Sequence, residues 1–167
     1  MPEQGVGAPA LFTRFSPAGQ ARRLQRTHRG STVQQQRQLE IVQALYDASA
    51  AANWPAVEQH LTDDFFISEG DHLPFAGVYR GRNALQQMFI KVMGMMDVTG
   101  LEVRARMAGD DHVIYLLDMV FAGEPPTKAT LTEMFRFRGD KVCELQPFYF
   151  DPAPVIAAVQ RKARKAG

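Results

Sequence analysis

Cysteine is almost absent from the sequence, since Cys143 is the only one among 167 residues. An internal disulfide and a multi-cysteine zinc site are therefore excluded, and the composition suits a reducing compartment. No window offers the roughly 20 apolar residues that a membrane-spanning helix needs. The net charge of +1 gives no electrostatic basis for binding nucleic acid or an anionic membrane. We therefore expect a cytoplasmic protein with no nucleic-acid or membrane partner.

Motifs for common cofactors and metals are also missing. The chain has no glycine-rich dinucleotide or phosphate loop and no serine-hydrolase elbow. It also lacks the His and carboxylate spacing typical of a zinc-binding helix. We expect neither a cofactor nor a metal ion.

Acidic residues are absent between Glu3 and Glu40, although this stretch contains six arginines. It is poor in large apolar side chains, so residues 1–33 are predicted to be a disordered basic extension. An organelle transit peptide and an over-long start are the alternatives. The predicted domain covers residues 34–160, and residues 161–167 form a basic tail.

Hydrophobic periodicity places helices first and strands second. A period of 3.6 predicts helices over 34–52 and 83–95, with a short helix after Asn53 between them. A strand is predicted over 64–70, and the Gly- and Pro-rich segment 70–81 is predicted to be a loop. A period of two then predicts strands over 101–108, 112–121, 129–138 and 141–150, with a short helix after Asp151. This order indicates an α+β domain with N-terminal helices covering one face of a curved antiparallel sheet.

Hairpin turns fix the register of the strands, and register fixes which side chains share a face. A turn at Gly139-Asp140 pairs Glu133 with Gln146 and predicts one inward set: Leu131, Glu133, Phe135, Phe137, Val142, Glu144, Gln146 and Phe148. In the preceding hairpin, strand 101–108 has its apolar side chains at odd-numbered positions, and the turn pairs these with even-numbered residues of the next strand. The second predicted inward set is therefore His112, Ile114, Leu116, Asp118 and Val120.

Carboxyl groups on an apolar face are candidates for acid–base chemistry. Burial without a partner raises a carboxyl pKa toward the range that general acid–base catalysis uses. The candidates are Glu133, Asp118, Glu144 and Glu69, which shares a face of its strand with Phe65 and Ile67. The alternative is structural, because an inward glutamate can pair with an arginine that reaches over the sheet edge.

Several segments resemble one known superfamily. They are Leu39–Tyr46, Asn53-Trp54, Leu61–Phe65, Gly77–Ala84, Glu133–Glu144 and Phe148–Asp151. Together they resemble nuclear transport factor 2-like proteins of the SnoaL-like kind over about residues 34–160. The resemblance implies a cone-shaped fold with an internal pocket, and it implies that Glu133 takes the place of the acid–base aspartate of the SnoaL-type cyclases. The chain departs from that pattern at Phe121, where those cyclases often carry a histidine, and at Phe148, where the related epoxide hydrolases have an aspartate.

These observations lead to two hypotheses of function. The first is a cofactor-independent isomerase, cyclase or dehydratase acting on a small apolar carbonyl compound. Glu133 would move the proton, and Asp118 would share that proton or orient the substrate. The remaining predicted pocket contacts are Glu69, Tyr46, Gln146, Phe135, Leu116 and Phe148.

The second hypothesis is a non-catalytic ligand-binding or dimerisation module of the same fold. The predicted outward side chains are apolar enough for self-association. They are Met134, Cys143, Leu145, Tyr149, Tyr115, Leu117 and Met119. A homodimer through the sheet is expected under either hypothesis.

Overall fold

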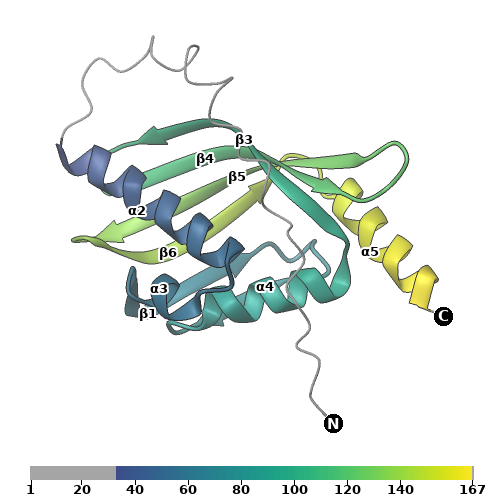
Figure 1. Cartoon of the computed structure of the whole chain (residues 1–167), viewed down its shortest axis with the longest axis horizontal. Coiled ribbons are helices and arrows are strands. Elements are labelled where there is room, and N and C mark those ends of the chain that lie inside the picture. The colour runs from purple at the N-terminus through teal and green to yellow at the C-terminus, as the bar shows by residue number, and fades with distance from the viewer. Residues whose placement is uncertain (1–32, 167) are drawn as a thin grey trace.

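The computed structural model describes residues 33–166, so the predicted basic extension lies almost entirely outside the described residues. The elements follow the predicted order of helices and then a meander of strands (Figure 1). Their bounds are α2 Val33–Ala50, α3 Trp54–Glu58, β1 Leu61–Glu69, β2 Gly77–Arg80, α4 Ala84–Met95, β3 Val98–Ala108, β4 His112–Phe121, β5 Thr127–Arg138, β6 Lys141–Tyr149 and α5 Ala153–Ala166.

The six strands form one curved sheet in the order β2-β1-β6-β5-β4-β3 (Figure 1). All neighbours are antiparallel except β1 and β6, which run parallel, so the sheet is mixed. Strand β2 lies within the segment 70–81, and the prediction that all of this segment is a loop was wrong. All four residues of β2 pair with β1, and this pairing stabilises the strand despite the glycines at the ends of β2. The α+β fold class is confirmed.

Local signals set the helix boundaries. Asn53 caps α3, because its Oδ1 accepts a hydrogen bond from the amide of Ala56 at 3.3 Å. Trp54 packs edge-on against Phe89, with ring centroids 5.3 Å apart, and this contact joins α3 to α4. Among residues 33–166, no helix is long and apolar enough to cross a membrane.

Helix α5 is longer than the short helix predicted after Asp151. It continues through the basic residues 161–165, where the sequence predicted a separate tail. Lys162 attaches the C-terminal half of α5 to the end of α4, since its Nζ lies 2.6 Å from the carbonyl oxygen of Met93 and 3.2 Å from Asp97 Oδ1. The tail residues therefore belong to a helix that packs on the end of α4.

A β-bulge in β3 reverses the predicted faces of β4. Met107 pairs with Ile114, as the hairpin turn requires, but Val103 pairs with Leu117 because the register shifts between Val103 and Ala105. The inward residues of β4 are therefore the odd-numbered ones, all less than 9% exposed: Val113, Tyr115, Leu117, Met119 and Phe121. The prediction for the even-numbered set was wrong. We call the face with the odd-numbered side chains the inner face, and the opposite one the outer face.

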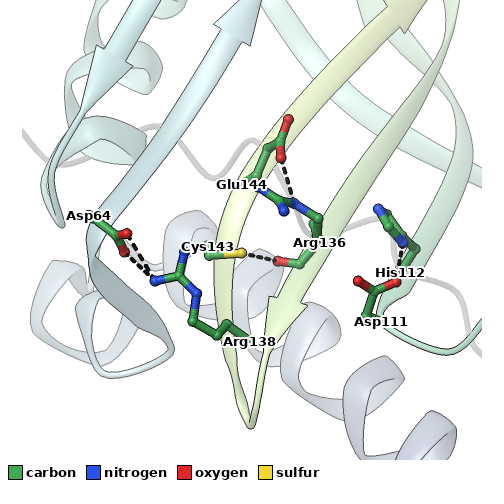
Figure 2. A network of polar contacts seen from close by, with 7 residues as sticks. All are labelled: Asp64, Asp111, His112, Arg136, Arg138, Cys143 and Glu144. Carbon is green, nitrogen blue, oxygen red and sulfur yellow. Dashed lines mark hydrogen bonds and ion pairs between the residues drawn. The ribbon is translucent and has the colours of Figure 1, made fainter.

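A second bulge lies at Cys143 in β6. Phe137 pairs with Val142, as predicted, but the next pair is Arg136 with Glu144, so Cys143 has no opposing residue. Cys143 is buried, and its Sγ lies 3.5 Å from the carbonyl oxygen of Arg136 (Figure 2). Beyond this point the inner face of β6 carries Leu145, Pro147 and Tyr149 instead of Glu144, Gln146 and Phe148.

Candidate functional site

A cavity of about 130 Å³ lies between the inner face of the sheet and helices α2 and α4. Its walls are mainly apolar and come from α2, α4 and strands β3 to β6. They include Leu45, Met88, Val92, Leu101, Met119 and Leu145. An apolar cavity of roughly 150 Å³ holds a benzene molecule, so this one suits a ligand of about one ring.

Glu133 is the one acidic side chain among the described residues that line the cavity. It projects from the middle of β5, where its backbone pairs with Tyr115 on one side and Pro147 on the other. The hydroxyl of Tyr46 donates a hydrogen bond to Glu133 Oε2. Burial raises the pKa of the Glu133 carboxyl above its ordinary value, and the Tyr46 hydrogen bond acts in the opposite direction.

Tyr46 is held in place by other aromatic side chains. Its ring stacks on Tyr115 with centroids 5.2 Å apart and meets Phe135 edge-on at 6.0 Å. Burial and the charge of Glu133 raise the pKa of the Tyr46 phenol well above its ordinary value. Tyr46 therefore remains a hydrogen-bond donor at neutral pH.

Glu69 is a second acid on the inner face, placed behind the cavity. It is 8% exposed, lies at the end of β1, and is not among the residues that line the cavity. Its Oε2 is buried and has no hydrogen-bond partner among the described residues. Burial, and then the charge of Glu133, raise the pKa of Glu69 to about 8. Burial, and then the charges of Glu69 and Glu133, raise the pKa of the half-buried Tyr149 well above its ordinary value.

Four predicted site residues lie on the wrong side of the sheet. The bulge in β3 puts Asp118 and Leu116 on the outer face, and the bulge at Cys143 does the same for Gln146 and Phe148. Asp118 accepts a hydrogen bond from Thr130 at 2.7 Å and pairs with Arg104 at 3.5 Å. It cannot share a proton with Glu133, because the sheet separates the two carboxyls.

The predicted outward face changes for the same reason. Tyr115, Leu117, Met119, Leu145 and Tyr149 lie on the inner face, and Cys143 is buried in its bulge. Met134 is the one member of that set that lies on the outer face and is partly exposed.

Two other acids near the end of the β5–β6 hairpin form ion pairs (Figure 2). Arg136 Nε lies 2.7 Å from Glu144 Oε2 on the outer face, and Arg138 Nη1 lies 2.9 Å from Asp64 Oδ2. For Glu144 the structural alternative, pairing with an arginine, is the one that the structure shows.

Sequence reasoning missed one polar side chain of the cavity, that of Ser49. Ser49 lies one helical turn after Tyr46 on α2, so both face the cavity. The sequence contains the signal, because a period of 3.6 residues puts Ser49 on the same stripe of this helix as Leu45 and Tyr46. Within residues 33–166, no three His, Cys, Asp or Glu side chains are arranged to hold a metal ion.

Comparison with known proteins gives one family and many similar structures. Residues 42–145 match the SnoaL-like domain family. No curated protein matches the chain.

Three solved structures illustrate the likeness of fold. An NTF2-like protein from Burkholderia xenovorans LB400 is 16% identical, with a TM-score of 0.64 over 75% of this chain and 97% of that one. A putative SnoaL-like polyketide cyclase from Jannaschia sp. CCS1 is 13% identical, with a TM-score of 0.64 over 78% and 96%. A hypothetical protein with a ketosteroid isomerase-like fold from Catenulispora acidiphila DSM 44928, in complex with trimethylamine, is 19% identical, with a TM-score of 0.57 over 72% and 92%. At these identities the likeness establishes the fold alone.

Proposed function

Because the chain belongs to the SnoaL-like domain family, we propose that it is a cofactor-independent enzyme acting on a small apolar carbonyl compound. The reaction class is an isomerisation, cyclisation or dehydration that begins with a proton transfer to Glu133. The substrate has about one ring, since the cavity measures about 130 Å³.

The observation that carries this proposal is an acid in an apolar cavity with a hydroxyl as its partner. Among residues 33–166, no Lys, Arg or His forms an ion pair with Glu133. A carboxylate that is not neutralised by a cation remains available to accept a proton. Its apolar surroundings lower the local dielectric constant, which strengthens its interactions with a bound substrate.

The proposed first step breaks a C–H bond next to the substrate carbonyl. Glu133 takes the proton, and the electron pair of the bond moves onto the carbonyl oxygen. Ser49 is the hydroxyl placed to hydrogen-bond that oxygen, while Tyr46 holds the carboxyl in position. Return of the proton to another carbon completes an isomerisation with every atom accounted for.

The alternative is a non-catalytic ligand-binding module. The position of Asp118 favours it, because the second carboxyl expected in the pocket is instead paired with Arg104 on the outer face. Such a module would bind an apolar ligand in the same cavity without exchanging its protons.

Proton exchange with solvent separates the two candidates. Small cyclic ketones and enones would first be screened for a rise in melting temperature, which reports binding. Each ligand found would then be incubated with the protein in D₂O, and deuterium entering next to the carbonyl would be followed by NMR. We expect the wild type to exchange, and Glu133→Gln to lose at least about 100-fold of the rate, the usual share of one acid–base group.

Glu144→Gln is the matched control, because it removes a carboxyl of the same size from the outer face. It is expected to exchange like the wild type. Exchange that survives in Glu133→Gln would rule out the proposed mechanism. Binding without exchange in the wild type would favour the binding module.

A further inference from the structure

The two inner-face glutamates lie on the two strands that flank β6. Ile67 of β1 pairs with Leu145 of β6, so Glu69, two residues later, continues to the level of Pro147. Pro147 in turn pairs with Glu133 of β5. Because side chains two residues apart on a strand share a face, Glu69 and Glu133 flank the buried ring of Pro147 on the inner face.

No positive charge separates or neutralises this pair. Within the described chain, neither carboxyl forms an ion pair with Lys, Arg or His. The titratable groups on the strands and helix around the pair are Tyr46 from α2, Tyr115 from β4 and Tyr149 from β6. Arg106 of β3 pairs with Tyr115 and acts on its phenol. Helix α4 contributes apolar side chains to the cavity, and His72, which follows β1, is exposed.

The hydrogen bonds distinguish the two carboxyls. Glu133 receives a hydrogen bond from the Tyr46 hydroxyl, which stabilises its charged form. Glu69 has a buried oxygen with no donor, so nothing stabilises a charge there. Two like charges in one buried site cannot both form at low cost.

We propose that Glu69 and Glu133 act as one electrostatically coupled pair, in which Glu69 carries a proton at neutral pH and thereby allows Glu133 to remain ionised as the base. Glu69 is thus a positioning residue that acts through Glu133 without touching the substrate. The catalytic consequence rests on the proposed function, but the coupling of the two carboxyls does not. The pKa of about 8 for Glu69 agrees with this assignment.

NMR titration of ¹³C-labelled glutamate carboxyls tests the pair without any substrate. In the wild type, Glu69 is expected to titrate near pH 8. The chemical shift of the Glu133 carboxyl should show its main transition at lower pH. It should also show a second, smaller inflection at the pH where Glu69 titrates. In Glu133→Gln the Glu69 midpoint should fall by about one pH unit or more, the size of interaction that couples two sites. In Glu69→Gln the second inflection of Glu133 should disappear.

Glu144→Gln, which removes an outer-face carboxyl, should leave both midpoints unchanged. The proposal is overturned if the wild-type Glu133 signal shows no inflection with Glu69, or if Glu144→Gln moves the Glu69 midpoint as far as Glu133→Gln does. The wild-type titration alone decides the first point, even if a variant fails to fold. Coupled titrations without deuterium exchange would reject the proposed function but support the pairing of Glu69 with Glu133. Deuterium exchange without coupled titrations would support the proposed function but reject the pairing.

Discussion

The burial of Glu69 makes the stability of the protein depend on pH. Its folded-state pKa of about 8 lies above its ordinary value of 4.5, so the folded state holds the proton more tightly than the unfolded state. Stability should therefore be highest below the ordinary value and should fall as pH rises through about 8. The loss is expected to be on the order of a few kcal/mol.

Urea denaturation at about pH 5.5 and about pH 8.5 measures this contribution. The wild type should lose stability between the two values, and Glu69→Gln should lose much less, because an amide has no charge to gain. Glu40→Gln, which changes an exposed glutamate of α2, should keep the wild-type dependence. Equal losses in the wild type and Glu69→Gln would show that Glu69 ionises as readily in the folded chain as in the unfolded one.

Single residues were predicted well where no register was needed. The alternation of its own strand put Glu69 on the buried face, where it lies, although it is not among the residues that line the cavity. Tyr46, predicted as a pocket contact, does line the cavity. Asp118 was placed through its partner strand, and that inference failed. The sequence of β4 contained the better signal, because its odd-numbered residues are all apolar while its even-numbered residues include His112 and Asp118.

At the scale of elements, the strands were predictable and the bulges were not. The β4 strand was predicted with its observed bounds, His112–Phe121, because alternation and turn residues are local signals. A bulge adds one residue to a strand without changing its composition, so the pattern still looks regular on both sides of it. The shift between Val103 and Ala105 and the bulge at Cys143 each change the register of a strand pair, which is why four of the eight predicted site residues lie on the outer face.

The end of α5 depends on one lysine. Lys162 Nζ contacts the carbonyl oxygen of Met93 at 2.6 Å and Asp97 at 3.2 Å, and its hydrogen bond is the main cause that lowers the pKa of Asp97. Lys162→Met keeps the apolar stem but removes these contacts, so we expect a loss of about 1 kcal/mol. The pKa of Asp97 should rise toward its ordinary value, and amides of the last turns of α5 should exchange faster.

Lys165→Met is the matched control for Lys162→Met. Lys165 is more exposed and contacts Asp97 at 3.5 Å without a hydrogen bond to Met93. Its loss should change stability by less than about 0.5 kcal/mol. If both variants behave alike, the docking of α5 depends on general charge near Asp97 and not on the Lys162 contacts.

For the whole molecule, the order of elements was enough to predict the α+β class, and the resemblance to nuclear transport factor 2-like proteins implied the more specific fold. Helices followed by an antiparallel meander leave few ways to cover one face of a sheet. The parallel pairing of β1 with β6 joins strands about 80 residues apart, and no local pattern reports it. That pairing is nevertheless what brings Glu69 to the same face as Glu133, so the candidate site was less predictable than the fold.

The outer face of the sheet leads to a prediction about assembly. Its central strands carry partly exposed apolar side chains, among them Leu116 and Met134, and Phe148 beside them is 49% exposed. The ion pairs Arg104–Asp118 and Arg136–Glu144 provide polar contacts on the same face. A self-complementary surface with apolar and paired polar groups suits a two-fold dimer. We therefore expect a homodimer through this face, although most of the residues first predicted for it lie elsewhere.

Light scattering on the intact chain should give the mass of two copies. Met134→Glu places a charge at the centre of the outer face and should yield monomers that retain the wild-type circular dichroism, because the side chain is not part of the core. Ile90→Glu, at a 60% exposed site on α4, should remain dimeric. A wild-type mass of one copy would reject the dimer. A dimer that persists in Met134→Glu would mean that the contact uses another surface.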